Sequence, residues 1–155
     1  MPIEDNKALV RRFFEETWNK GNPDAVDHYI AADCVSKSGV ASGPLLKRAI
    51  TNWHTAFPDF AFHIVRLVAE GDHVVAWTRF TGTHRGVFHH APAGNRTWNR
   101  GPWEPTGKAI DVPEVYMFRV AAGEDRRNCC VCVGRPGIHR AARGHAGSGR
   151  DQDMN

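Results

Sequence analysis

The spacing of apolar residues changes near Pro58, and this change constrains the fold more than any other feature of the sequence. Before Pro58 apolar side chains recur about every four residues, as at Val10, Phe14 and Trp18, which is typical of one buried helical face. After Pro58 apolar and polar residues alternate, as in a strand with one buried face. Three helices followed by antiparallel strands predict an α+β fold with the helices on one face of a curved sheet.

The expected helices have clear ends in the sequence. Gly21 ends the first helix, and Asn22 and Pro23 then supply an N-cap and a first-turn proline for a short second helix. The third helix opens with the Ser-Gly-Pro of residues 42–44 and stops before Pro58.

Residues 74–86, VVAWTRFTGTHRG, read as a strand that ends in a polar Gly-Thr-His turn. The Glu-Gly-Asp of residues 70–72 joins this strand to the preceding one as a hairpin, and residues 110–120 form a further strand. The loop between them, residues 82–107, is long, and such a loop in a compact domain is usually functional or disordered. We interpret 74–86 as part of the wall and rim of a small-molecule pocket.

Composition divides the chain in two. Residues 1–133 have enough apolar content for one domain with a core, whereas residues 134–155 are rich in Arg and Gly and are predicted to be a disordered tail. Residues 126–155 hold six Arg and two Asp and so account for the positive net charge of +3. The body shows no basic cluster with interleaved aromatics, which argues against specific nucleic-acid binding.

We expect a cytoplasmic protein with no membrane segment, because residues 1–20 are amphipathic and charged. Its four cysteines are Cys34 and the group Cys129, Cys130 and Cys132, which form neither a disulfide framework nor a paired zinc pattern. The histidines His84, His89 and His90 have no nearby carboxylate or cysteine in the sequence, so no metal site is expected.

Several motifs occur in a fixed order: WNKGN with PDAVDHYIAAD behind it, AFPDF, VAEGDHVVAW, GTHRGVF, PTGKAI and VYMFRV. With them, residues 7–120 resemble the SnoaL-like polyketide cyclase family of the nuclear-transport-factor-2-like superfamily. The resemblance implies a cone-shaped α+β barrel, with a curved antiparallel or mixed sheet packed against three N-terminal helices around a hydrophobic cavity. It also implies a homodimer and acid/base chemistry without a cofactor.

The resemblance implies an aldol-type ring closure of a small hydrophobic, polyketide-like substrate. A base removes an acidic proton between carbonyls, and the enolate attacks a second carbonyl of the same molecule. A carboxylate in an apolar cavity suits the first step because burial raises the pKa of such groups, and hydrogen-bond donors stabilise the enolate.

The predicted catalytic residues are Glu114 as base, Tyr116 as enolate donor and Arg79 as a second orienting group. Tyr116 stands where the antibiotic cyclases of the family carry a histidine. An interior packing role for Tyr116 and a solvated strand-end charge for Glu114 stay open as alternatives. If Arg79 faces inward, its expected partner is Glu114 or Asp111, because a buried guanidinium needs an anion.

Five further residues are predicted to contact the substrate: Trp53, His54, Trp77, His84 and Phe118. Trp53 fits the apolar stripe of the third helix, whereas His54 lies on its surface or at the pocket rim. His84 is expected to hydrogen-bond the loop at the pocket mouth. Residues 91–107, with Trp98 and Trp103, form either a lid or a contact with a partner subunit.

The end of the chain departs from the family. The antibiotic cyclases place their main acid/base aspartate on the last strand, but residues 126–150 contain no Asp or Glu. One hypothesis is that the reading frame of the gene is altered near Arg126. Translation of another frame past this point into an apolar strand with an Asp would support it.

Two alternatives to the cyclase therefore stay open. The first is an epoxide hydrolase of the same fold, which needs a carboxylate–arginine network, with Asp111, Arg79 and Glu114 as candidates. The second is a non-catalytic module for small-molecule binding or dimerisation that has lost the final-strand aspartate.

Overall fold

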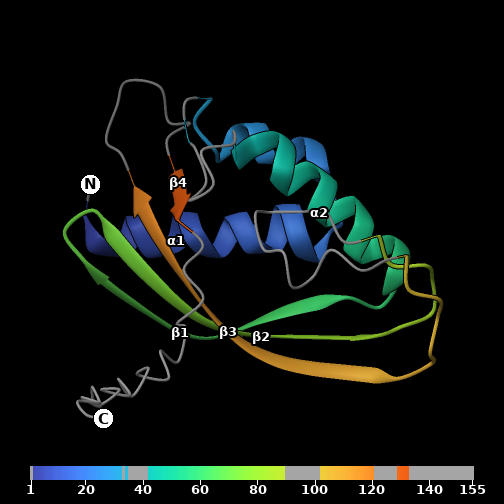
Figure 1. The fold of residues 1–155 in the computed structure, drawn as a ribbon. Helices are drawn as coiled ribbons and strands as arrows, with labels where there is room; N and C mark the ends of the chain where they lie inside the picture. Colours follow the sequence, from blue (N-terminus) through green and yellow to red (C-terminus); the bar gives the residue numbers. More distant parts are fainter. Residues whose placement is uncertain (1, 33, 35–41, 90–101, 121–128, 133–155) are drawn as a thin grey trace, which may run out of the picture.

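The structure, a computed structural model, describes residues 2–32, 34, 42–89, 102–120 and 129–132. Its helical elements are α1 (Ile3–Phe13), η1 (Phe14–Asn19), η2 (Pro23–His28) and α2 (Ser42–Ala56). Its strands are β1 (Ala61–Glu70), β2 (His73–Thr83), β3 (Ala109–Val120) and β4 (Cys129–Cys132). The helices lie over one face of a curved sheet, which confirms the predicted α+β architecture (Figure 1).

The described strands form one antiparallel sheet in the order β1-β2-β3-β4. The predicted hairpin joins β1 to β2 through Gly71, whose φ of 56° is the left-handed conformation that favours glycine. Over the described residues the sheet is open, so the predicted closed barrel is not observed. Closure requires the edge strands to pair, and β4 contributes only four residues, opposite Met117–Val120 of β3.

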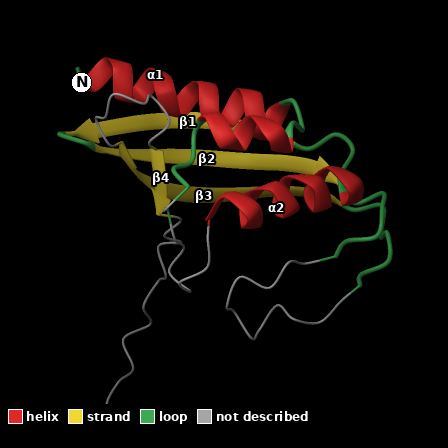
Figure 2. Cartoon of the chain, turned by 90° about the horizontal axis from the view of Figure 1, so that it is seen from above, coloured by secondary structure: helices red, strands yellow, loops and turns green. Residues whose placement is uncertain are grey.

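Helices α1 and η1 form one continuous helical segment along β1 (Figure 2). The segment changes to π-helix at Phe14, where the Thr17 hydroxyl donates to the Phe13 carbonyl oxygen at 2.6 Å. At its end, the side chain of Asn19 donates to the Phe62 carbonyl at 3.1 Å and accepts from the Phe62 N–H at 2.7 Å. This double hydrogen bond attaches the helix end to the edge strand.

The predicted helix ends are confirmed. Gly21 follows η1 with a φ of 60°. The Asn22 side chain caps η2 by accepting from the N–H groups of Asp24 and Ala25 at 3.1 and 3.4 Å, and Pro23 occupies the first turn.

Alternation along β2 decides which side chains face the helices. The inner face, defined here as the face that the helices cover, takes Val74, Ala76, Thr78 and Phe80, all buried. On β1 the predicted alternation holds to Ile64, after which the register shifts between Ile64 and Arg66. This bulge returns Leu67 to the interior.

Strand β2 continues through Thr83, so the predicted Gly-Thr-His turn begins later than expected. The next three residues, 84–86, form a strap over the end of α2. The N–H groups of Arg85 and Gly86 both donate to the Ala56 carbonyl oxygen, at 2.8 and 3.0 Å. A Cβ added to Gly86 would overlap the Thr55 carbonyl oxygen, so the strap fits the helix end only with glycine here.

The helices in the described ranges are too short or too polar to cross a lipid bilayer.

Candidate functional site

Glu114 and Tyr116 meet on the inner face of β3. Side chains two residues apart on a strand share a face, and both are half-buried here. The Tyr116 hydroxyl donates a hydrogen bond to the Glu114 carboxylate. The predicted common face of these residues is therefore confirmed, and they form a carboxylate–phenol pair.

Aromatic side chains hold the Tyr116 ring in place. Its centroid lies 5.5 Å from that of Phe14 and 5.8 Å from that of Phe62, both in edge-to-face geometry. Across the sheet, fully buried Thr78 stands opposite Glu114, and Ile64 stands opposite Thr78. The carboxylate thus projects from a largely apolar face.

Further partly exposed apolar side chains lie on α2, which covers the inner face, and on β3. Trp53 of α2 lies 5.1 Å from Phe80 and 4.7 Å from Phe88, measured between ring centroids. The apolar groups that are partly buried against the core on α2 and β3 are Leu46, Ala49, Trp53, Ile110, Val112 and Tyr116. Glu114 and the three of these groups that lie with it on the inner face of β3, Ile110, Val112 and Tyr116, are called the inner-face site below.

The structure places two predicted site residues on the opposite face. Trp77 and Arg79 alternate with the buried residues of β2 and point outward, with Trp77 47% exposed. Arg79 donates to the Asp111 carboxylate, with Nε 2.9 Å from Oδ1. Exposure keeps the guanidinium hydrated, which avoids the cost of burying a charge. The predicted inward positions of Trp77 and Arg79 are therefore wrong, and Asp111, Arg79 and Glu114 form no common network.

Two other predicted contact residues belong to the framework. The Nε2 atom of His54 lies 2.6 Å from the Trp18 carbonyl oxygen, and its half-buried ring packs edge-on against Phe60. His54 therefore joins α2 to the end of η1 and is not a surface residue. Phe118 is fully buried and packs edge-to-face on Phe13 and Phe14, so it belongs to the core next to Tyr116.

His84 connects the strap to the far end of the long loop. Its Nδ1 lies 3.2 Å from the Thr106 hydroxyl, as predicted for a loop contact, and its ring stacks on Phe57 with centroids 5.0 Å apart. The side chain is 8% exposed, and its Nε2 has no hydrogen-bond partner within the described residues.

The long loop between β2 and β3 is described only in part. Phe88 and Trp103 pair as an antiparallel bridge, with their rings 5.8 Å apart. Trp98 and His90 lie outside the described residues, as do the predicted tail at 134–155 and the region of the frame hypothesis at Arg126.

No sequence pattern predicted the role of Asp59. Its carboxylate accepts hydrogen bonds from the N–H and the hydroxyl of Thr83, at 2.6 and 2.7 Å. These hydrogen bonds lower the pKa of the Asp59 carboxyl below its usual value. The AFPDF segment therefore anchors the end of β2, a contact over 24 residues that no local pattern indicates.

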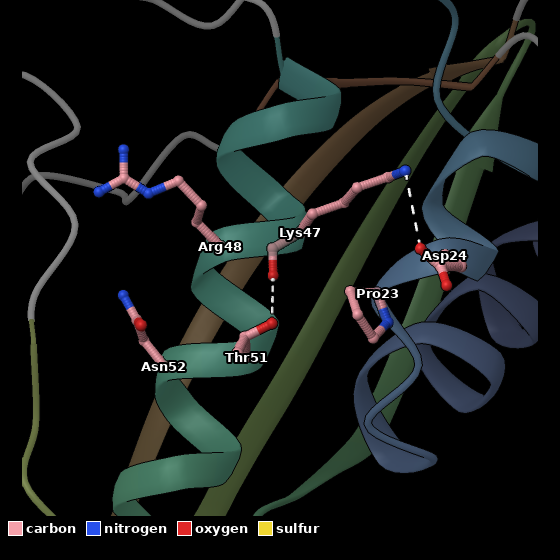
Figure 3. A pocket seen from close by; sticks show the side chains of 6 residues that line it. All are labelled: Pro23, Asp24, Lys47, Arg48, Thr51 and Asn52. Atoms are coloured by element: carbon pink, nitrogen blue, oxygen red, sulfur yellow. Dashed lines mark hydrogen bonds and ion pairs between the residues drawn. The ribbon is translucent and has the colours of Figure 1, made fainter.

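A groove of about 300 Å³ lies between η2 and α2 (Figure 3), lined by Pro23, Asp24, Lys47, Arg48, Thr51 and Asn52. Lys47 forms ion pairs with Asp24 at 4.0 Å and Asp27 at 2.6 Å. Most residues that line the groove carry charged or other polar side chains, unlike the predicted hydrophobic pocket. Across the described residues, no three His, Cys, Asp or Glu side chains gather closely enough to hold a metal ion.

Comparisons with known proteins agree with this architecture. The family model described as SnoaL-like polyketide cyclase matches residues 8–128. A comparison with curated proteins returned no match.

Three solved structures with similar folds are low in sequence identity. A candidate SnoaL-like polyketide cyclase from Jannaschia sp. CCS1 has a TM-score of 0.64 and 24% identity, covering 84% of each chain. TsrD from Streptomyces laurentii has a TM-score of 0.61 and 20% identity, with 78% of this chain and 82% of TsrD covered. AclR from Streptomyces galilaeus, a candidate hydroxylase, has a TM-score of 0.61 and 21% identity, with 83% of this chain and 76% of AclR covered. At these identities the three structures show the fold alone.

Proposed function

Because the chain belongs to the SnoaL-like polyketide cyclase family, we propose that it closes a ring in a small apolar substrate by acid/base catalysis at the inner-face site. The reaction class is an intramolecular aldol-type closure of a polyketide-like ester and requires no cofactor. The observation that carries the proposal is the hydrogen-bonded pair of Glu114 and Tyr116 on a half-buried, apolar face.

In the proposed reaction, Glu114 takes a proton from a carbon that lies between two carbonyl groups of the substrate. The electron pair of the C–H bond forms an enolate. Its carbon then bonds to the carbon of another carbonyl group farther along the same molecule. The resulting alkoxide takes the proton back from Glu114. Protons balance, and the carboxylate is regenerated.

The hydrogen bond between Tyr116 and Glu114 couples the two groups. A phenol donates more strongly to a charged carboxylate than to a neutral carboxylic acid. When Glu114 takes the proton, the hydrogen bond that it accepts from the Tyr116 phenol weakens. Negative charge develops on the enolate oxygen at the same step. Tyr116 can then redirect its hydrogen bond to that oxygen, which stabilises the intermediate.

The test is ring closure of a panel of linear aromatic polyketide esters, followed by mass spectrometry and absorbance. We expect Glu114→Gln to lower kcat about 10²–10⁴-fold, the usual contribution of a general base, and Tyr116→Phe to lower it less. The matched control is Asp111→Asn, which removes a carboxylate from the outer face of the same strand. Wild-type protein without activity above background, or a fully active Glu114→Gln variant, contradicts the proposal.

One observation favours a second candidate, a pocket that binds without turnover. The described part of the last strand, Cys129–Cys132, carries no carboxylate. A thermal-shift screen against apolar ring compounds separates the two candidates, because stabilisation by a compound that the protein does not convert supports binding alone.

We further propose that two copies of the chain pair through the outer face of the sheet. This face carries four exposed large apolar side chains, Val65, Val68, Trp77 and Met117, at 45–57% exposure. The ion pairs Arg79–Asp111 and Arg119–Asp72 lie toward its two ends. A face with an apolar centre and both charge signs at its rim is complementary to a second copy of itself.

The size of this face is also suitable. Three strands of the length of β2 cover an area of about 500 Å², from the usual rise and strand spacing. Interfaces of standard size bury roughly 800 Å² per partner, and projecting side chains give the face more accessible area than this flat outline.

Light scattering after size exclusion tests the pairing. We expect a dimer for wild-type protein and a monomer for Trp77→Lys. Ile3→Lys replaces an exposed apolar side chain on α1, 42% exposed, and should leave the dimer intact. A monomeric wild type, or a dimeric Trp77→Lys variant, refutes the proposed interface.

A further inference from the structure

The inner face of β2 is apolar except for one hydroxyl, that of Thr78, which is fully buried. Burying a hydroxyl costs free energy unless it finds a hydrogen-bond partner. Here the hydroxyl donates to the backbone carbonyl oxygen of Glu114 at 3.2 Å. Thr78 also stands directly opposite Glu114 in the β2–β3 register, where Cβ atoms lie about 4.5–5.5 Å apart.

The described pairing of β3 at this point is with β2. Residue Pro113 precedes Glu114 and has no N–H to donate. On the other side of β3, the described pairing with β4 begins only at Met117. The Thr78 hydroxyl thus adds a side-chain hydrogen bond to the backbone pairing of β2 with β3 at Glu114.

We propose that Thr78 is a positioning residue for the carboxylate–phenol pair. Its hydroxyl fixes the orientation of the Glu114 carbonyl, and through it the direction in which the Glu114 side chain leaves the strand. That direction determines whether the carboxylate reaches the Tyr116 hydroxyl. The kinetic part of this inference rests on the proposed function, whereas the geometric part does not.

The chain offers an internal reference for a spectroscopic test. It contains two tyrosines, Tyr29 and Tyr116, and each hydroxyl donates to a glutamate, Glu16 and Glu114 respectively. NMR of protein labelled at the tyrosine ring therefore gives two signals from hydrogen-bonded phenols. Only the Tyr116 signal should respond to changes at Thr78.

The matched pair of variants is Thr78→Val and Thr17→Val. Thr17 is also fully buried, and its hydroxyl also donates to a backbone carbonyl, that of Phe13 at 2.6 Å. Both variants replace a hydroxyl with a methyl group of similar shape. We expect Thr78→Val to shift or broaden the Tyr116 signal and to leave the Tyr29 signal unchanged, whereas Thr17→Val should leave the Tyr116 signal in place.

The kinetic readout uses a substrate that the wild type converts. We expect Thr78→Val to lower kcat about 10-fold with less than about a threefold change in KM, because a sub-ångström misplacement of a base acts on the chemical step. Thr78→Ser, which keeps the hydroxyl, should restore most of the rate. Thr78→Ala, which removes the hydroxyl without adding atoms, should reproduce the effect of valine.

The inference is overturned if the Tyr116 signal is unchanged in both Thr78→Val and Thr78→Ala, or if Thr17→Val alters it as strongly. If the wild type converts no substrate, the proposed function fails, and the NMR comparison still decides the role of Thr78.

Discussion

Replacing Gly86 with alanine should destabilise the protein more than any other glycine-to-alanine change in the described residues. A Cβ at this position would overlap the Thr55 carbonyl oxygen and lie 3.0 Å from its carbonyl carbon. Because these are backbone atoms of a packed helix end, the overlap is relieved only when the strap moves off α2. The strap then loses its hydrogen bonds from Arg85 and Gly86 to the Ala56 oxygen.

The magnitude follows from these two effects. Overpacking costs about 1–3 kcal/mol, and each lost hydrogen bond costs about 0.5–1.5 kcal/mol. Gly86→Ala should therefore lower the free energy of unfolding by about 2–6 kcal/mol, a large share of the roughly 5–15 kcal/mol of a typical domain.

Two other glycines complete a graded series. In Gly82→Ala the new Cβ would lie 3.1 Å from the Cβ of Phe57, and we expect an intermediate loss of about 1–3 kcal/mol. In Gly43→Ala nothing lies within 4 Å of the new Cβ. The residue is in the first turn of α2 and precedes Pro44, whose ring crowds the preceding Cβ in a helical backbone, so we expect a change within about 0.5 kcal/mol.

Urea unfolding at neutral pH, followed by circular dichroism and tryptophan fluorescence, measures all three variants by linear extrapolation. The expected order of stability is wild type and Gly43→Ala together, then Gly82→Ala and last Gly86→Ala. A Gly86→Ala variant within about 0.5 kcal/mol of the wild type, the usual range for neutral surface changes, would falsify the described fit of the strap against α2.

Two titratable groups give opposite pH dependences of stability. Burial, with a hydrogen bond to a glutamate, raises the pKa of Tyr29 from its usual value of 10.0 to about 12. The stabilising effect of the neutral phenol is therefore complete below pH 10 and is lost as the pH rises toward 12, and Tyr29→Phe should remove this alkaline loss in denaturation curves. Hydrogen bonds from Thr83 lower the pKa of Asp59, so its contribution is present above its unfolded value of about 3.8 and is lost as the pH falls through the lowered value. Asp59→Asn should therefore be less stable than wild type at neutral pH, and the difference should shrink in acid; a difference that grows on acidification contradicts the assignment.

Local signals predicted much of this fold correctly. Gly21, Asn22, Pro23 and Pro58 lie at the expected helix ends, because caps and breakers act through backbone groups within a few residues. The shared face of Glu114 and Tyr116 was also predictable, since alternation along a single strand requires no knowledge of its neighbours.

The face of β2 was harder to predict. Its sequence VVAWTRF carries apolar side chains at both even and odd positions. Periodicity alone therefore does not decide whether Ala76 and Thr78 or Trp77 and Arg79 face the helices. Ala76 is fully buried in the core, while Arg79 pairs with Asp111 in solvent. Packing between elements therefore determines which face of β2 is turned toward the helices, and the local sequence pattern does not.

By itself, then, the sequence determined the order of the helices and of strands β1 to β3, the helix ends, and the shared face of Glu114 and Tyr116. Only the tertiary structure decided the outward direction of Arg79, the link from His54 to Trp18 and the tether from Thr78 to Glu114. The physical reason is separation along the chain. Caps, turns and alternation involve residues two to four positions apart, whereas the two hydrogen bonds join residues 36 positions apart and depend on register and packing that no local pattern contains.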